Sequence, residues 1–261
     1  NLTIDTSITN LYPGQYQGLM GQAINTTITD VNFSNVSIQN TVNPYTGTMA
    51  GCFLKSTADN VHLLSGSVRG AKFVGGLMGE SSGGGGTKVL SCSNAATVTG
   101  APIVDDGVGG IAGTVNGTNV TIDNCYNSGA VISLSEGPAG GIVGRNVKST
   151  QVGISIQNCY NVGAVRGSVA APINAGSEWV VNNCYYLNSS SVSPDPNAGA
   201  EAKTVNELRS YQMVGLLNGG LKTTDDATRA WFYDSGNRND GYPQFQKTNY
   251  ANWQQVGAEM T

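Results

Sequence analysis

Gly110-Ile111-Ala112-Gly113 is followed by Asn124-Cys125-Tyr126-Asn127, and Gly141-Ile142-Val143-Gly144 is followed by Asn158-Cys159-Tyr160-Asn161. The same pair of signatures therefore occurs twice within residues 110–161. Self-similarity with a period of a few tens of residues is the sequence mark of a repeat architecture. The chain is therefore interpreted as an array of copies before any other signal is considered.

The glycine-bracketed signature recurs along most of the chain. Its copies start at residues 18, 51, 76, 110 and 141, the second being the degenerate Gly51-Cys52-Phe53-Leu54. The second signature keeps the same rhythm, and its equivalent positions are expected to be Asn32, His62, Cys92, Cys125, Cys159 and Cys184. A branched aliphatic residue follows six residues later in the first five copies: Ile38, Val68, Val98, Val131 and Val165.

Each copy contains short apolar stretches in which apolar residues alternate with small or polar ones, bounded by Gly and Asn. This pattern is typical of strands and turns. No helical period runs through residues 1–187, which excludes helical repeats. A single coil cannot bury its apolar face, but coils stacked about 4.8 Å apart can. The sequence predicts an all-β fold, a right-handed parallel β-helix of about five to six coils over residues 1–187.

The glycine and asparagine positions receive structural interpretations. Gly-Gly pairs such as Gly75-Gly76 are expected to allow positive φ at a sharp corner before a strand. The residue after the second glycine should point into the core: Leu19, Cys52, Leu77, Ile111 and Ile142. Asparagines repeat as Asn94/Asn127/Asn161 and as Asn124/Asn158/Asn183. We expect them at corners in left-handed geometry, with side-chain amides bonding from coil to coil.

Residues 188–261 break the repeat and are expected to form a linker, a short helix and an aromatic cap. Residues 193–197 are rich in turn formers, and Thr204 with Glu207 makes a capping box ahead of an apolar-periodic run. Asn218-Gly219-Gly220 should end a helix of about 13 residues. The aromatic triplet at 231–233 could be a binding platform, but we expect it to cover the last open coil.

Composition removes several classes of function. The chain has 261 residues, 36 of them Gly, only 11% charged residues and a net charge of −4. Such a chain has no basic patch to neutralise phosphates, so nucleic-acid binding is not expected. No apolar run is long enough to span a membrane. The sequence lacks a signal peptide or anchor, which suggests a portion of a larger secreted protein.

The cysteines are expected to be buried free thiols. Cys92, Cys125, Cys159 and Cys184 share one column, and Cys52 lies in another. Thiols in a line do not offer tetrahedral ligands to zinc, and in-register side chains would strain a disulfide. We therefore expect no metal site, no cofactor and no disulfide framework, only small apolar side chains in the core.

The repeated Gly-Ile-x-Gly core with its Asn-Cys-Tyr-Asn-x-Gly-x-Val stretch resembles the GLUG-motif repeats of bacterial surface proteins. The closing Asn239-Asp240-Gly241-Tyr242-Pro243 also resembles the end of such arrays. The family includes adhesin-like proteins and repeats beside the catalytic domain of immunoglobulin-A-cleaving peptidases. The resemblance is strongest in residues 74–167, and it implies architecture and an extracellular or cell-surface location more than an activity.

Catalytic residues are not expected in this segment. A zinc peptidase of the family's known type needs a His-Glu-x-x-His helix, and His62 is the only histidine. Asp105-Asp106 is expected to be a solvated turn, and Asp30 and Asp123 lie three coils apart. No hydrolytic carboxylate pair follows from the repeat, although loops could supply one.

We therefore expect a non-catalytic, monomeric rod that displays a binding surface to a host or cell-surface protein or glycan. Two alternatives stay open: an accessory domain of a larger secreted peptidase, and a polysaccharide-acting β-helix enzyme. Val108 and Ile142 should point inward, whereas Lys148 should lie in a corner loop.

The candidate ligand surface is an aromatic ladder of Tyr126, Tyr160 and Tyr185. Each follows a cysteine expected to point inward, so its own side chain should point outward. An exposed ladder along consecutive coils could stack on sugar rings or dock an extended protein. The alternative is that these tyrosines form a satellite apolar cluster beneath adjacent corner loops.

Overall fold

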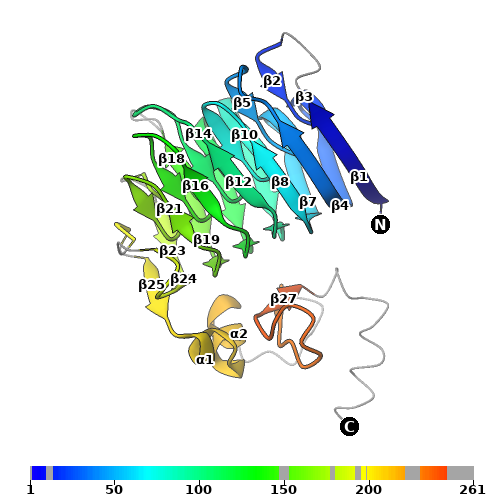
Figure 1. Cartoon of the computed structure of the whole chain (residues 1–261). Helices are drawn as coiled ribbons and strands as arrows, with labels where there is room; N and C mark the ends of the chain where they lie inside the picture. The colour runs from blue at the N-terminus through cyan, green and yellow to red at the C-terminus, as the bar shows by residue number, and fades with distance from the viewer. Residues whose placement is uncertain are drawn as a thin grey trace.

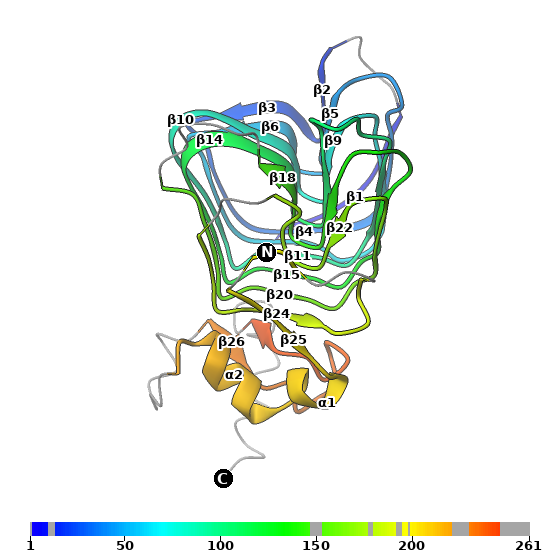
Figure 2. The ribbon, with the colours of Figure 1, turned by 90° about the vertical axis from the view of Figure 1, so that its left-hand side faces the viewer.

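The chain forms a parallel β-solenoid of about five turns with a small cap that contains two helices (Figure 1). The computed structural model describes residues 2–9, 14–146, 153–176, 180–191, 195–197, 199–220 and 230–245. Lys148, predicted in a corner loop, lies outside these residues. Successive coils are nested one behind another in Figure 2, with the cap against one side.

The strands of successive coils pair in parallel and form five columns along the rod. One column contains β3 (Met20–Ile24), β6 (Ala50–Leu54), the start of β10 (Met78–Leu90), the start of β14 (Ala112–Asp123) and β18 (Val143–Asn146). The next contains β4 (Thr27–Gln39), β7 (Thr57–Leu63), the ends of β10 and β14, β19 (Ser155–Gln157) and β23 (Val180–Asn182). The N-terminal β1 (Leu2–Thr9) pairs with β4.

The other columns use shorter strands. The third contains β11 (Ser93–Asn94), β15 (Tyr126–Asn127), β20 (Tyr160–Asn161), β24 (Cys184–Leu187) and β25 (Ala200–Lys203). The fourth contains β8 (Gly66–Arg69), β12 (Thr97–Gly100), β16 (Val131–Ser133) and β21 (Val165–Arg166). The fifth is a separate sheet of β2 (Tyr16–Gln17), β5 (Tyr45–Thr46), β9 (Phe73–Gly75), β13 (Val108–Gly109), β17 (Ala139–Gly140) and β22 (Ala170–Ala171).

The predicted register holds for the column of branched aliphatic residues and for the later copies of the repeat. Ile38, Val68, Val98, Val131 and Val165 are paired in register from coil to coil. Val108 and Ile142 are fully buried, as expected of inward positions. The alternation and the glycine spacing therefore located these inward positions, because both follow the pairing, although each coil has more and shorter strands than apolar stretches.

The second copy of the glycine signature starts three residues earlier than predicted. Ala50 pairs with Met20 on one side and with Met78 on the other. The equivalent segment is therefore 48–51, and Met49 rather than Cys52 corresponds to Leu77. Leu19 was also expected inside the core but is 48% exposed. It belongs to the first coil, where β1 covers β4 and no described strand covers β3.

The predicted cysteine column is wrong at its N-terminal end. His62 pairs with Asn32 and Ser93, and Ser93 pairs with Tyr126. His62 therefore belongs to the column of the tyrosines, and its predecessor Val61 takes the cysteine position. The six-residue spacing to Val68 misplaced it, because this coil has one more residue between the two columns than the later coils have.

The glycine pairs are required for close packing and not for positive φ. Neither Gly109 nor Gly110 has positive φ, which corrects the prediction for these pairs. An added Cβ would lie 1.9 Å from the carbonyl oxygen of Ala112 at Gly109, and 2.1 Å from that of Gly141 at Gly110. At Gly113 it would lie 2.5 Å from the backbone nitrogen of Val74. The first residues of β10, β14 and β18 thus pack directly on the backbone of strands in the fifth column.

The two asparagine columns differ in backbone geometry. Asn94, Asn127 and Asn161 are fully buried. The Asn94 amide donates to the side-chain oxygen of Asn127 at 2.7 Å, and the Asn127 amide donates to that of Asn161 at 2.8 Å. The predicted coil-to-coil amide bonding is confirmed there, and also in the other column, where the Asn183 amide donates to the side-chain oxygen of Asn158 at 2.7 Å. Left-handed geometry occurs only in that second column. Asn124, Asn158 and Asn183 each have φ of 52°.

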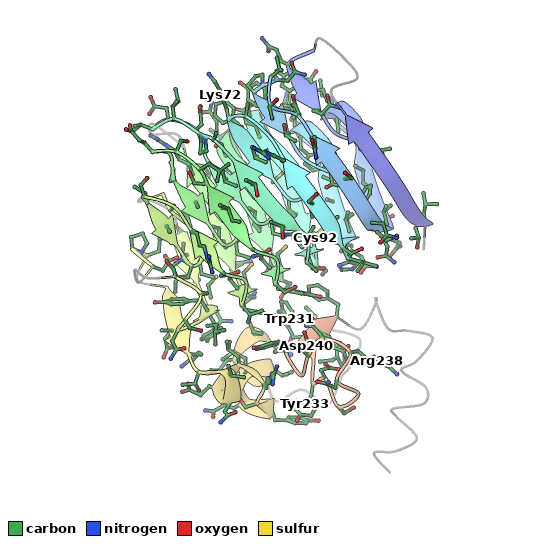
Figure 3. The ribbon with its side chains drawn as sticks, in the orientation of Figure 1. Lys72, Cys92, Trp231, Tyr233, Arg238 and Asp240 are labelled. Atoms are coloured by element: carbon green, nitrogen blue, oxygen red, sulfur yellow. The ribbon has the colours of Figure 1, made fainter. Side chains whose placement is uncertain are left out.

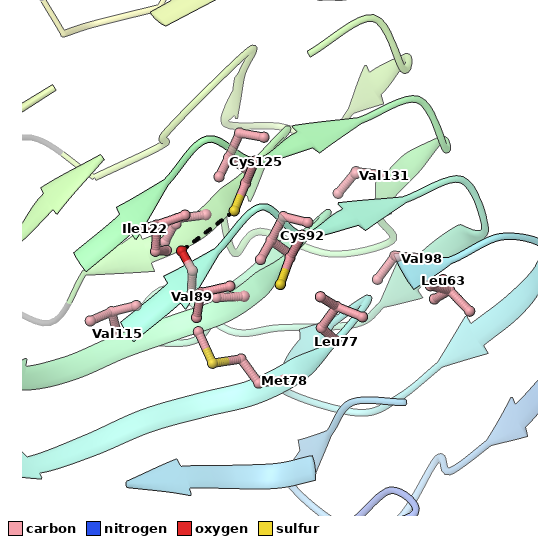
Figure 4. Close-up of a cluster of buried hydrophobic side chains, with 14 of the residues drawn as sticks. Leu63, Leu77, Met78, Val89, Cys92, Val98, Val115, Ile122, Cys125 and Val131 are labelled. Atoms are coloured by element: carbon pink, nitrogen blue, oxygen red, sulfur yellow. Dashed lines mark hydrogen bonds between the residues drawn. The ribbon is translucent and has the colours of Figure 1, made fainter. Parts of the chain in front are cut away.

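The core runs continuously inside the coils and includes the cysteine column. Figure 4 shows Cys92 and Cys125 among Val89, Val98 and Ile122. All five cysteines are free and buried. The Cys125 thiol donates weakly to the carbonyl oxygens of Asp123 and Val89, at 3.3 Å and 3.5 Å. The thiols behave as small core side chains.

The C-terminal region begins while the parallel pairing is still continuing. β25 pairs in parallel with β24, so the sheet extends beyond residue 187 to Lys203. Residues 193 and 194 of the predicted linker lie outside the described residues. Asp195 is anchored, since its carboxylate accepts from the backbone nitrogens of Ile173 and Asn174.

The single predicted helix is two short helices, α1 (Val205–Leu208) and α2 (Tyr211–Leu217). The predicted capping box of Thr204 and Glu207 is present. Ser210 interrupts the helix because its side chain accepts from the Met213 backbone nitrogen at 3.1 Å and caps a new helix. Neither helix is long and apolar enough to cross a membrane. β26 (Trp231–Phe232) and β27 (Gln244–Phe245) form an antiparallel pair.

Candidate functional site

Tyr126, Tyr160 and Tyr185 are brought together on consecutive coils, as the sequence predicted. They are paired in register in β15, β20 and β24. The rings of Tyr126 and Tyr160 stack with centroids 5.0 Å apart and an interplanar angle of 3°. The parallel register produces this stacking, because equivalent side chains repeat at the spacing of neighbouring strands. We call these three residues the tyrosine column.

The tyrosine column is covered, so it is not the exposed ladder that the sequence suggested. Tyr160 is fully buried and Tyr185 is 6% exposed. They share an apolar cluster with residues of the cap, here residues 204–220 and 230–245: Leu208, Met213, Val214, Leu217, Trp231 and Phe245. The alternative of a satellite cluster is therefore closer to the structure, with the cap rather than corner loops as its cover.

The cap lies along the side of the rod and not over its last coil. Trp231 donates from Nε1 to the side-chain oxygen of Asn124 at 3.0 Å. The Tyr160 hydroxyl donates to the carbonyl oxygen of Pro243 at 2.7 Å and accepts from Asn239 at 2.8 Å. Burial raises the pKa of Tyr160 well above its ordinary value. Of the aromatic triplet, Trp231 and Phe232 are buried and only Tyr233 is exposed.

His62 lies at the edge of the same interface and is hydrogen-bonded through both ring nitrogens. Its Nδ1 is 2.8 Å from the Ser93 hydroxyl, and its Nε2 is 2.8 Å from the side-chain oxygen of Asn60. Asn60 donates its amide to Asp30, so its oxygen faces His62 and Nε2 carries the proton. Nδ1 is then unprotonated and accepts a hydrogen bond from the Ser93 hydroxyl. This is the arrangement of a serine nucleophile and its histidine base.

The Ser93–His62 pair is nevertheless closed off. Ser93 is 3% exposed, and His62 is 1% exposed with the Phe245 ring stacked on it at 5.5 Å. Burial lowers the pKa of His62 to about 4, although Asp30 opposes the shift. The imidazole is therefore neutral near pH 7, and a substrate carbonyl has no access to Ser93 in this arrangement.

A second aromatic column lies on the side of the rod away from the cap, and the sequence analysis missed it. Tyr16, Tyr45 and Phe73 are paired in register in β2, β5 and β9. Their ring centroids are 4.9 Å and 4.7 Å apart, and the Tyr45 and Phe73 rings are inclined by only 9°. We call these three residues the aromatic stack. All three are partly exposed.

The aromatic stack borders a column of polar residues at the adjacent strand corner. Gln22, Cys52, Glu80, Thr114 and Arg145 are paired in register there, and we call them the corner column. Glu80 is only 6% exposed, and burial raises its pKa, although Ser82 and Asn116 donate to its carboxylate. Burial, and then the nearby Glu80, raise the pKa of Tyr45 to about 12.

Charged residues surround the end of the aromatic stack. Arg145 forms an ion pair with Asp105, at 2.9 Å. Asp106 was expected to be solvated with its neighbour, but it is 4% exposed because its carboxylate accepts from the Ile103 backbone nitrogen. Burial raises the pKa of Asp106, and Lys72 and Arg145 partly offset the shift. In Figure 3 Lys72 lies at this edge, opposite the cap residues Trp231 and Tyr233.

The described residues contain no cluster of His, Cys, Asp or Glu that could hold a metal ion. The aromatic stack could have been found from the sequence. Tyr16 and Phe73 each stand two residues before a glycine of the repeat, and Tyr45 does so before Gly47. The misplaced start of the second copy concealed this period.

Comparisons with known proteins support the architecture. No family model and no curated protein matches the chain. The fold matches a crystal structure named "a putative immunoglobulin A1 protease from Bacteroides ovatus", with a TM-score of 0.61 and 20% sequence identity. The match covers 94% of this chain and 86% of that chain. At this identity the likeness concerns the fold alone.

Proposed function

We propose that this chain is a non-catalytic, GLUG-type repeat rod of a secreted or surface-bound bacterial protein, and that it binds a host or cell-surface ligand. The observation that carries the proposal is the state of its one histidine. His62 is buried, bonded through both ring nitrogens and covered by the cap. The group best suited to proton transfer near neutral pH is thus engaged in holding the structure together.

The other reactive groups support the same proposal. The cysteine thiols are buried, and burial raises the pKa of Cys92 and Cys159 well above the ordinary value. Burial also opposes ionisation of Cys125, but hydrogen bonds with Cys159 and Cys92 lower its pKa to about 5. Its side chain is nonetheless fully buried, so a substrate does not reach the sulfur. The tyrosine column is engaged by the cap. The aromatic stack is partly exposed, and aromatic faces beside polar groups serve binding without needing a reactive group.

One observation favours a second candidate, an accessory role beside a peptidase. The Bacteroides ovatus protein with the similar fold carries the name of an immunoglobulin A1 protease. This chain has no His-Glu-x-x-His sequence, so a zinc peptidase of that motif would need residues from outside it. The two candidates differ in whether contact with immunoglobulin A1 is part of the function.

The test measures binding and cleavage in one experiment. The purified chain is passed over immobilised mucin and immunoglobulin A1, and both ligands are then examined for cleavage products on gels. We expect binding to mucin with no cleavage of either ligand. Preferential binding of intact immunoglobulin A1 would favour the accessory role. Cleavage of either ligand, or binding to neither, would overturn the proposal.

A further inference from the structure

A pair of exposed tyrosines lies on the cap. Tyr211 is the first residue of α2 and is 62% exposed, and Tyr233 follows β26 and is 39% exposed. Their rings stack with centroids 4.7 Å apart and an interplanar angle of 28°. In Figure 3 Tyr233 lies on the side of the cap that faces away from the rod, whereas Trp231 lies between cap and rod. Two separate segments therefore build an accessible aromatic surface.

The loop that follows Tyr233 is folded tightly around one carboxylate. Asp234 is 5% exposed, because its carboxylate accepts from three backbone nitrogens of the loop, those of Arg238, Asn239 and Gly241, at 2.9 Å, 2.7 Å and 3.0 Å. Since Asp234 is the direct neighbour of Tyr233 in the chain, these bonds bring the far end of the loop back to the tyrosine pair. We call residues 233–242 the cap loop.

Two arginine side chains lie on the cap loop. Arg238 lies over Gly236, where an added Cβ would be 3.3 Å from its Nε. Arg209 comes from the end of α1, and its guanidinium carbon lies 4.7 Å from the centre of the Tyr242 ring. An added Cβ at Gly241 would be 3.3 Å from the Cδ of Arg209. Both arginines are exposed, so their stems are in contact with the loop while their N–H groups reach solvent.

The carboxylates around these arginines are mostly engaged elsewhere. Ion pairs among the described residues involve Arg145 and Lys203, neither of which belongs to the cap. Asp234 is bound by backbone N–H groups, and the exposed Glu207 is bound in the capping box of α1. Asp240 is the exposed carboxylate that remains in the cap loop. Two guanidinium groups without a carboxylate partner in the described chain therefore lie near the tyrosine pair.

Aromatic rings beside such guanidinium groups match the chemistry of an acidic sugar. The C–H face of a pyranose ring stacks on an aromatic ring, and the hydroxyls at its rim bond to polar neighbours. A carboxylate on the sugar accepts the two parallel hydrogen bonds that a planar guanidinium offers. A neutral sugar would leave the guanidinium groups without a partner, and an acidic peptide would leave the tyrosine rings without one.

We propose that Tyr211 and Tyr233, with Arg209 and Arg238, bind a carboxylated pyranose of a glycan. This inference rests on the proposed binding function and names its ligand class. The tyrosine pair lies on the side of the cap away from the rod, so a glycan reaches it without displacing the cap from the tyrosine column (Figure 3).

The experiment uses the whole chain and the methyl α-glycoside of N-acetylneuraminic acid as the probe. Saturation-transfer NMR and calorimetry measure its binding to the natural protein and to two variants. Tyr233→Leu keeps apolar volume but removes the flat ring, and we expect an affinity loss of about fivefold. Arg238→Gln keeps a polar side chain but removes the charge, and we expect a loss of about tenfold.

Two further sugars test which part of the probe is recognised. Methyl α-D-glucuronide is also a carboxylated pyranose, and binding of either acidic sugar supports the site while identifying its source. Methyl β-D-galactopyranoside lacks the carboxylate and should bind about tenfold more weakly. Galactoside binding as strong as that of both acidic sugars would overturn the proposed ligand class, as would absence of saturation transfer with both acids.

The matched control variant is Arg166→Gln. Arg166 is an exposed arginine in β21 of the rod, and we expect this variant to bind the probe like the natural protein. Tyr233 and Arg238 are exposed, so their variants should fold, which thermal melting checks. Equal affinity in Tyr233→Leu, Arg238→Gln and the natural protein would overturn the site.

A sialidase arm separates this inference from the proposed function. Sialidase removes terminal acidic sugars from mucin and leaves its polypeptide and neutral sugars in place. Binding to mucin that survives sialidase and is unchanged in Tyr233→Leu would support a binding rod and overturn the sugar site. Binding that is lost with sialidase, and weakened in Tyr233→Leu, supports both. Absence of binding to mucin, to immunoglobulin A1 and to the isolated sugars would overturn both.

Discussion

At the scale of single residues, a substitution in the cysteine column tests whether its thiols act only as packing side chains of the core. Cys125 is fully buried between Val89 and Ile122. Cys125→Ala should lower the free energy of unfolding by about 1–2 kcal/mol, because the lost sulfur leaves a small cavity. Urea unfolding measures this loss. Thiol titration of the native protein should find no rapidly reacting cysteine, and fast labelling before denaturant is added would contradict the packing role.

His62 should make the protein less stable in acid. The pKa of His62 is about 4 in the folded chain, against a reference value of 6.5 that stands for the unfolded chain. The folded state therefore favours the neutral ring. Above pH 6.5 the group is neutral in both states and contributes no pH dependence. As the pH falls from 6.5 to about 4, the unfolded chain binds the proton first and stability is lost. Below that range this group adds no further loss.

The measurement compares pH profiles of unfolding for the natural protein and His62→Gln. The natural protein should lose up to about 3 kcal/mol more than the variant between pH 7 and pH 4. Glu80 and Asp106 act in the opposite direction, because a raised carboxyl pKa favours the folded state in acid. They are present in both proteins and cancel in the difference. Parallel profiles would show that His62 is not buried as a neutral ring.

At the scale of structural elements, the glycine corners make a sharp prediction. Gly110→Ala places a Cβ 2.1 Å from the Gly141 carbonyl oxygen and should abolish folding or destabilise it severely. Gly84→Ala is the matched control, because an added Cβ there meets nothing within 4 Å. Thermal melts and circular dichroism of the two variants decide the point. Similar melting of both would mean that the strand backbones do not approach as closely as described.

The strands could be predicted from the sequence more securely than their packing. Alternation and glycine spacing locate each coil, because burial imposes a period of two on every strand. The sequence did not reveal that Gly109 and Gly110 are needed for backbone contact. Close backbone approach and positive φ both require glycine, so the residue type alone does not distinguish the two causes. His62 was assigned to the wrong column because its coil has one more residue between the two columns than the later coils have. Counting six residues back from Val68 therefore reaches His62, one residue after the true equivalent position, Val61. The tyrosine column was located correctly, but nothing local in the sequence signals that a segment some 80 residues later covers it.

At the scale of the whole molecule, the cap and the rod are joined through a few residues, and Trp231 is central among them. Its ring contacts Phe245 at 4.5 Å and Tyr160 at 5.3 Å, and its nitrogen donates to Asn124. Trp231→Ala should weaken docking of the cap by about 3–5 kcal/mol, because a large buried side chain is lost. The rod keeps its own core, so it should remain folded.

Hydrogen exchange measures the two parts separately. In Trp231→Ala, amide protection of α1 and α2 should fall strongly, while β7, β10 and β14 keep theirs. The tyrosine column should then become accessible, which a rise in binding of an apolar dye would report. Tyr211→Ala serves as the control, because Tyr211 is 62% exposed on the cap and contacts Tyr233 rather than the rod. Equal loss of protection in cap and coils would mean that the cap and the solenoid unfold as one cooperative unit, so that covering the tyrosine column is a condition for the rod to fold at all.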